Sequence, residues 1–121
     1  MTLNEIAHEL VAGCRENRAR ANLQTLYAPD AQSVEAADMG NGTTVTGLAA
    51  IDGKHDWWEN SMTVHDAKVG GPFVHGDDRF AVTFDMDVTE NATGKRSQMQ
   101  EVGIYHVADG KIVREEFFYG N

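Results

Sequence analysis

Glu35 is the residue whose position in the sequence most directly suggests chemistry. Pro29 ends the helix before it, because proline has no N–H to donate and disfavours helical angles in the residue that precedes it. The next two residues are expected to form a turn, and residues 32–36 a short strand. Side chains two residues apart lie on one face of a strand, so Ser33 and Glu35 share a face. Glu35 is therefore predicted to point a carboxylate into a cavity.

Helical spacing of apolar residues dominates the first half of the chain. Thr2 and Glu5 form a capping-box pattern, and the helix that it opens is predicted to run to about Glu16. A shorter helix is predicted around residues 23–26. A third is expected to begin near residue 46 or 47, with one stripe of side chains along it. The members of that stripe are Leu48, Ile51, His55, Trp58 and Met62.

From Val64 onward the spacing between apolar residues changes from nearly four positions to two. Residues 80–88 alternate apolar and polar side chains, which predicts a strand with one buried and one exposed face. A turn over residues 90–95 leads to a second strand, and Asp109 with Gly110 forms a hairpin turn before a last strand. The second half is therefore predicted to be an antiparallel meander.

Composition and charge exclude several classes of protein. The 121 residues are 41% hydrophobic and 24% charged, as expected for one globular domain spanning 1–121, and no apolar run is long enough to cross a bilayer. The net charge of −9 repels phosphate backbones, so a nucleic-acid partner is not expected. The N-terminal residues lack the pattern of a signal peptide, which favours a cytoplasmic location and no membrane association.

The order of the predicted elements resembles the cone-shaped nuclear transport factor 2-like fold, in particular its SnoaL-like and ketosteroid isomerase-like branch. Three segments carry the resemblance: residues 26–31 before the first strand, 47–51 opening the third helix, and 109–112 in the last hairpin. The resemblance implies an α+β, cystatin-like domain. Three N-terminal helices would pack on the concave face of a curved, mostly antiparallel sheet.

The resemblance also suggests which residues could do chemistry. In ketosteroid isomerases the general base stands five residues after the aspartate of the Asp-Ala turn, and Glu35 holds that position here. The two oxyanion donors of the isomerase fall at Val11 and Gly103, neither of which can donate a hydrogen bond from its side chain. The chain is therefore expected to keep the base and to lack the enolate-binding pair of the steroid enzymes.

By the same resemblance, alternate residues of the last two strands turn inward and bring Glu101 and Glu115 toward Glu35. His55 could join them from the third helix. Carboxylates gathered in an apolar pocket cannot all stay ionised, so at least one pKa, including that of Glu35, is expected to rise. These four residues are the candidate catalytic set. The candidate ligand-binding residues are Trp58, Phe84, Met86, Met99, Tyr105, Phe117 and Tyr119.

Such a set predicts acid–base chemistry on a small hydrophobic molecule: isomerisation, elimination, hydration or hydrolysis without an organic cofactor. A metal site built from His55 and the three carboxylates is not expected, because no pair of ligands has metal-binding spacing. The alternative is a non-catalytic module that binds a small ligand or only associates with other chains. In that case each carboxylate would be a structural hydrogen-bond partner.

A homodimer is expected from the opposite face of the sheet. Val102, Ile104 and Phe118 would form a patch there that is too apolar to leave in water. A two-fold axis that brings two such patches together is the simplest way to cover it.

Overall fold

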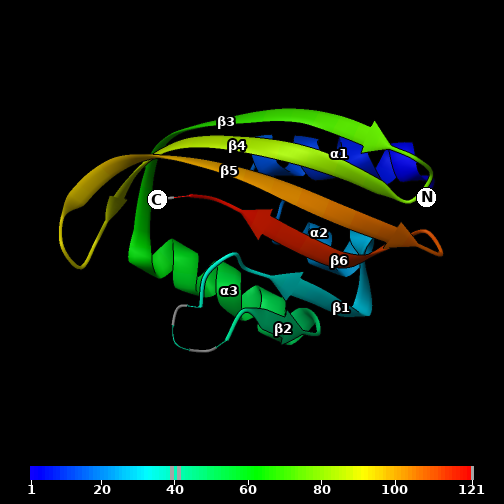
Figure 1. The fold of residues 1–121 in the computed structure, drawn as a ribbon, viewed down its shortest axis with the longest axis horizontal. Coiled ribbons are helices and arrows are strands. Elements are labelled where there is room, and N and C mark those ends of the chain that lie inside the picture. The colour runs from blue at the N-terminus through cyan, green and yellow to red at the C-terminus, as the bar shows by residue number, and fades with distance from the viewer. Residues whose placement is uncertain (39, 41, 121) are drawn as a thin grey trace.

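The computed structural model describes residues 1–38, 40 and 42–120, and it contains one six-stranded sheet flanked by helices (Figure 1). The strand order is β2-β1-β6-β5-β4-β3. Every neighbouring pair is antiparallel except β1 and β6, which are parallel. The strands are β1 (Tyr27–Val34), β2 (Thr44–Thr46), β3 (Met62–His75), β4 (Arg79–Glu90), β5 (Lys95–Ala108) and β6 (Lys111–Phe118).

The predicted α+β class and mostly antiparallel sheet are thus confirmed. The helices are α1 (Leu3–Arg15), α2 (Asn22–Leu26) and α3 (Leu48–Ser61). Only α1 and α2 precede the sheet, whereas α3 follows β2, so the expectation of three N-terminal helices holds for two of them. None of the helices in the described residues is long and apolar enough to cross a membrane.

Helix α1 begins as the sequence predicts. The Thr2 hydroxyl accepts a hydrogen bond from the Glu5 amide at 3.2 Å, and the Glu5 carboxylate accepts one from the Thr2 amide at 2.8 Å. This reciprocal pair satisfies two of the donors left free at a helix start. The buried side of α1 carries Ile6, Leu10 and Val11, which belong to one hydrophobic core with Phe80 and Val82 of β4.

The passage from α2 into β1 differs from the expected turn. The chain becomes extended at Tyr27, and Pro29 lies within the strand rather than before a turn. In place of a turn, the pairing of β1 with β6 has a register shift between Tyr27 and Gln32. Proline is tolerated at such a break because no ladder hydrogen bond is lost. Glu35 therefore lies one residue beyond the end of β1.

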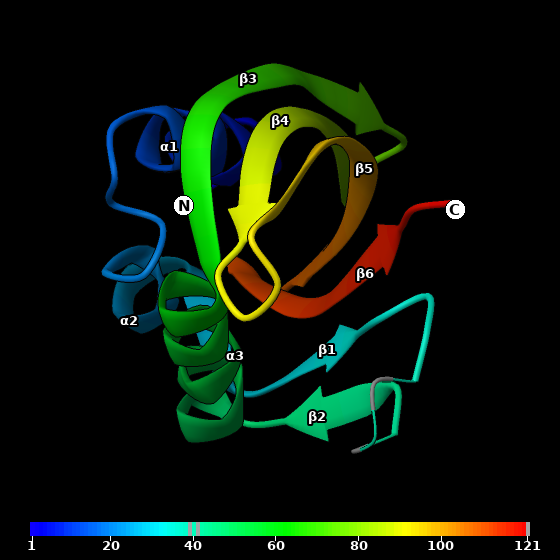
Figure 2. The same ribbon diagram turned by 90° about the vertical axis from the view of Figure 1, so that its left-hand side faces the viewer.

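The long strands β3, β4 and β5 curve strongly around the core (Figure 2). In β4, Phe80, Val82 and Val88 are buried, and Phe84 packs against the core. The alternation of β4 therefore faces the direction that the sequence predicts. Neighbouring rows of side chains continue this inner face onto β5 and β6, where Tyr105 pairs with Glu115 and Gly103 with Phe117.

Helix α3 is tied to the rest of the chain by Arg20. Its guanidinium donates to both oxygens of Asp52, at 2.6 and 3.1 Å, and to Glu59 at 2.8 Å, while Asp56 lies 3.6 Å away. Carboxylates four and three residues apart lie on one face of a helix, so one arginine can reach all of them. These contacts hold one side of α3 against Arg20 and thereby determine which other side of the helix faces β1.

Candidate functional site

Lys54 on α3 is the cation around which the candidate site is built. Its ammonium lies 2.9 Å from Glu35 Oε1 and donates to the Ser33 hydroxyl at 2.6 Å. The side chains of Lys54 and Glu35 are 25% and 28% exposed, so the pair is half-buried but remains open to solvent. Ser33 and Glu35 do share a face, as the sequence predicts, and that face is turned toward α3.

Aromatic rings form the apolar wall of the site. The Lys54 ammonium lies 5.3 Å from the centre of the Phe117 ring, within the range of a cation–π contact. Phe117 packs edge-on against Tyr105, whose ring stacks on Phe80 with centres 5.0 Å apart. Three neighbouring strands thus supply a continuous aromatic surface next to the ion pair.

Glu115 lies beneath this wall and is almost completely buried, with 4% of its surface exposed. Burial raises its pKa to about 7, although the nearby Lys54 charge and the Tyr27 hydroxyl act in the opposite direction. Its Oε1 atom has no hydrogen-bond partner. A protonated carboxyl group tolerates such surroundings far better than a carboxylate does. Glu115 is therefore a buried acid that holds its proton near neutral pH.

Glu101 is the second carboxyl group with a strongly shifted proton affinity. Burial and the neighbouring Glu35 charge raise its pKa to about 7, and the Lys54 charge opposes this rise. Glu101 has no ion pair to a lysine or arginine among the described residues, whereas Glu35 has Lys54. The two groups are thus close enough to influence one another but have different surroundings. This is the arrangement that separates an acid from a base.

An open hollow of about 670 Å³ reaches Glu101 from outside. It forms where β6 ends at Phe118, because residues of β5 before Val102 have no partner strand on that side. The inner and outer faces of the sheet meet at this uncovered edge. The hollow is lined by Thr83, Phe84, Asp85, Gln100, Glu101, Val102, Phe118, Tyr119 and Gly120.

Tyr119 links the hollow to Glu35. It lines the hollow, and burial together with the charges of Glu35 and Glu101 raises its pKa. Among the other candidate ligand-binding residues, Phe84 also lines the hollow, while Met86 and Met99 pair with each other farther along β4 and β5. Trp58 is half-buried on α3. The structure therefore brings Glu101, Phe84 and Tyr119 together at the entrance.

His55 does not join the carboxylates. It lies in a separate hollow of about 240 Å³ with Cys14, Arg20 and Glu59. Burial and the Arg20 charge lower the pKa of His55. The physical reason is helix geometry, since Lys54 and His55 are neighbours about 100° apart around α3. Because Lys54 faces β1, His55 is turned toward α1 and the loop that follows it.

Gly103 is the position at which the sequence resemblance placed one of the two oxyanion donors, and two aromatic rings surround it. A Cβ atom built there would lie 3.0 Å from the Tyr105 ring and 3.3 Å from that of Phe117. The two rings thus occupy the space that a larger side chain would need. Val11, the other position of the resemblance, is buried in the core. The acidic groups of this site come instead from Glu101 and Glu115.

Sequence reasoning missed Lys54 and Tyr27. A signal for Lys54 was present, because it stands three residues after Ile51 and four before Trp58, inside the stripe predicted to face the sheet. A lone lysine in such a stripe needs a buried anionic partner. Nothing comparable distinguished Tyr27, whose role depends on its position beside Glu115.

In the part of the chain that the structure describes, no three His, Cys, Asp or Glu side chains are arranged to hold a metal ion. The Lys54 ammonium instead bridges Glu35 Oε1 and the Ser33 hydroxyl.

Known protein families and solved structures include clear matches to this chain. A sequence model of the SnoaL-like domain matches residues 1–119. A protein of Mesorhizobium loti, provisionally described as a SnoaL-like polyketide cyclase and also as a carbohydrate phosphatase, is 39% identical and has a TM-score of 0.91. The alignment covers 98% of this chain and 100% of that one. Among proteins with curated descriptions, none matches.

More distant structures share the fold. An NTF2-like protein of Burkholderia thailandensis is 20% identical with a TM-score of 0.82, over 99% of this chain and 92% of that one. TerC, co-crystallised with polyporic acid, is 22% identical with a TM-score of 0.73, over 96% and 89% of the two chains. The resemblance of the sequence to SnoaL-like domains and to the nuclear transport factor 2-like fold is thereby confirmed.

Proposed function

Because the chain belongs to the SnoaL-like family, we propose that it is a cofactor-independent enzyme that uses two carboxyl groups for acid–base chemistry on a small molecule. Glu35 acts as the general base and Glu101 as the general acid. Lys54 pairs with Glu35, and Glu115 supplies a neutral, polar floor beneath the aromatic wall.

The observation that carries this proposal is the unequal environment of Glu35 and Glu101. Only Glu35 has an ammonium group at ion-pair distance, 2.9 Å. Glu101 has a pKa raised to about 7 by burial and by the Glu35 charge. Glu35, paired with an ammonium group, is suited to accept a proton, and Glu101 holds a proton more tightly than a solvent-exposed carboxyl does and can give it.

The reaction favoured by this pair is proton transfer next to a carbonyl group. Glu35 removes a proton from carbon, and the electrons of that C–H bond move toward the carbonyl oxygen. Glu101 donates its proton to that oxygen, which gives an enol. Return of the proton from Glu35 to another carbon atom, with Glu101 regaining its own, completes an isomerisation. No group outside the substrate and the two carboxyls is consumed.

The walls favour a neutral, apolar substrate. The one ammonium group of the site is already paired with Glu35, and burial disfavours the charged forms of Glu101 and Glu115, so an anionic substrate would find no free cation to bind it. Phe84 and Tyr119 at the entrance and Phe117 farther in offer aromatic surface. The hollow of about 670 Å³ is within the size range of small-molecule sites. The relative described as a polyketide cyclase and the fold relative crystallised with polyporic acid are consistent with a small organic substrate.

A panel of neutral enolisable ketones and their carboxylated analogues tests the proposal. Deuterium exchange from solvent at the carbon next to the carbonyl reports proton removal even when the product is unknown. We expect exchange with neutral compounds, little with the anionic analogues, and a loss of at least about tenfold in Glu101→Gln. Binding of neutral ketones without exchange above that in buffer would favour the alternative function, a small-ligand-binding module.

A further inference from the structure

The ion-pair partner of Lys54 is the group that loses its charge in the proposed reaction. The Lys54 ammonium lies 2.9 Å from Glu35 Oε1, so its charge is compensated as long as Glu35 is a carboxylate. When Glu35 takes a proton from carbon, it becomes a neutral acid and the Coulomb attraction between the two side chains is lost. Proton removal from the substrate therefore frees a cation inside the site.

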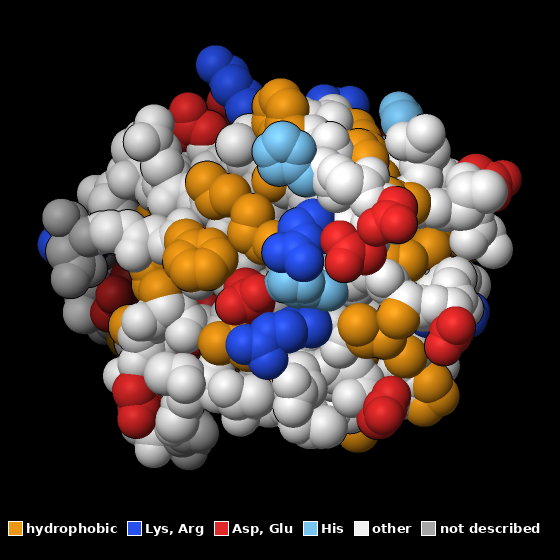
Figure 3. Space-filling view, turned by 45° about the vertical axis from the view of Figure 1, so that its right-hand side comes forward, with side chains coloured by type: hydrophobic (Ala, Val, Ile, Leu, Met, Phe, Trp, Pro, Cys, Tyr) orange, Lys and Arg blue, Asp and Glu red, His pale blue; other side chains and the backbone are white. Residues whose placement is uncertain are grey.

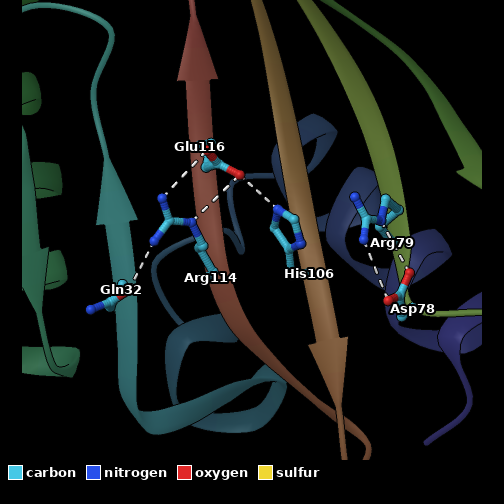
Figure 4. Close-up of polar contacts among 6 residues, drawn as sticks. All are labelled: Gln32, Asp78, Arg79, His106, Arg114 and Glu116. Atoms are coloured by element: carbon cyan, nitrogen blue, oxygen red, sulfur yellow. Dashed lines mark hydrogen bonds and ion pairs between the residues drawn. The ribbon is translucent and has the colours of Figure 1, made fainter.

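The other ion pairs have partners whose charge the proposed reaction does not change. In the part of the chain that the structure describes, they are all made by arginine or histidine side chains. Basic, acidic and histidine side chains gather on one face of the molecule (Figure 3). Arg114 contacts Gln32 and Glu116, and its neighbour Arg79 contacts Asp78 (Figure 4). None of these three partners lines the open hollow.

The charge of Lys54 acts on every carboxyl group of the site. It is paired with Glu35, and it opposes the rise in the pKa of both Glu101 and Glu115. In the proposed reaction one negative charge passes from Glu35 to the substrate oxygen, and then to Glu101 when Glu101 gives its proton. The ammonium can therefore stabilise the negative charge at each of these stages.

The Lys54 side chain is suited to a change of partner. An ammonium group carries three N–H donors at the end of a flexible stem. One of them donates to the hydroxyl of Ser33 at 2.6 Å, and Ser33 is 1% exposed. The ammonium also lies 5.3 Å from the centre of the Phe117 ring. These two contacts keep the ammonium in the site after Glu35 has become neutral.

We propose that Lys54 is a catalytic residue that exchanges its ion pair with Glu35 for a contact with the enolate oxygen of the substrate as Glu35 takes the proton. The inference rests on the proposed function, because it adds a third group to the two carboxyls. Lys54 keeps its own proton throughout, so the balance of protons and electrons is unchanged. The new contact forms only after proton transfer begins, and such an interaction lowers the barrier without tightening the binding of the neutral substrate.

Binding of 4-nitrophenol tests this exchange of partners without turnover. Its phenolate has a negatively charged oxygen on a planar carbon framework, as an enolate does, and its visible absorbance reports its ionisation. The uncharged amide of Glu35→Gln represents the protonated base. At a pH where 4-nitrophenol is ionised, we expect Glu35→Gln to bind the phenolate at least about tenfold more tightly than the native protein does.

Adding Lys54→Met to Glu35→Gln separates a catalytic role of Lys54 from a structural one. In this background there is no carboxylate for Lys54 to hold in place, so a purely structural role predicts no change in phenolate affinity. We expect the double variant to lose the tenfold gain. It removes both members of the ion pair, so it leaves no uncompensated charge to prevent folding. As a probe without an ionisable oxygen, 4-nitroanisole should bind equally to all three proteins.

Lys95→Met in the same Glu35→Gln background is the matched control, because Lys95 is exposed at the start of β5, outside the site. It removes the same charge and should leave phenolate affinity unchanged. Equal phenolate affinity with and without Lys54, in a protein that does exchange deuterium into ketones, would overturn this inference and leave the proposed function standing. Phenolate binding that depends on Lys54, in a protein that exchanges no ketone, would support the contact of Lys54 with a ligand oxygen and refute the proposed function.

Discussion

Replacing Glu35 by glutamine is expected to lower turnover by at least about a hundredfold while changing ligand affinity by less than about threefold. The amide keeps the shape of the side chain and can still accept a hydrogen bond from Lys54, but it cannot take a proton from carbon. The loss should appear in kcat rather than in KM. Steady-state kinetics on the best compound of the ketone panel, with binding measured by calorimetry, gives both numbers.

The matched control for this variant is Glu90→Gln, because Glu90 is an exposed carboxylate at the end of β4, outside the site. It should retain native turnover. If Glu35→Gln were as active as this control, Glu35 would be only the structural partner of Lys54, and the base would have to be sought elsewhere.

Glu115 should make the protein less stable as pH rises. Its pKa is about 7 in the folded state and 4.5 in the unfolded state. Between these values the folded state binds more protons, so the free energy of unfolding falls with increasing pH. The stabilisation is complete below pH 4.5 and is lost as pH passes through 7. For a shift of this size the loss amounts to about 3 kcal/mol.

Chemical denaturation from pH 4 to pH 8 measures this slope directly. Glu115→Gln has no proton to lose and should show a flatter profile than the native protein over the interval from pH 5 to pH 8. Glu90→Gln, which changes an exposed carboxylate at the end of β4, is the matched control and should keep the native slope in this interval. Parallel profiles for Glu115→Gln and the native protein would show that Glu115 does not hold its proton in the folded state.

Much of the fold could be predicted because local patterns agree with it. The capping box at Thr2 and the strict alternation in β4 each determine one element, and the folded chain follows both. The turn expected after Pro29 was wrong for a tertiary reason. Pairing of β1 with β6 keeps that segment extended, and the sequence of β1 alone contains no information about β6.

In the candidate site, the sequence predicted correctly only those side chains whose orientation follows from strand register. Glu101 and Glu115 face inward because the alternation continues from β4 through its neighbours. Helix rotation was harder to predict. A stripe that includes His55 is only about 100° from one that includes Lys54, and the Arg20 contacts decide between them. The pairing of Lys54 with Glu35 thus depends on a contact between residues 32 positions apart.

Titration of the Glu101 carboxyl group by carbon-13 NMR tests the central claim most directly, because an acid and a base must differ in proton affinity before they can act as a pair. The account predicts a pKa of about 7 for Glu101 in the native protein. It also predicts a higher value in Lys54→Met, since the Lys54 charge holds the pKa down. A value for Glu101 near 4.5 that does not respond to Lys54→Met would contradict the assignment of Glu101 as the acid.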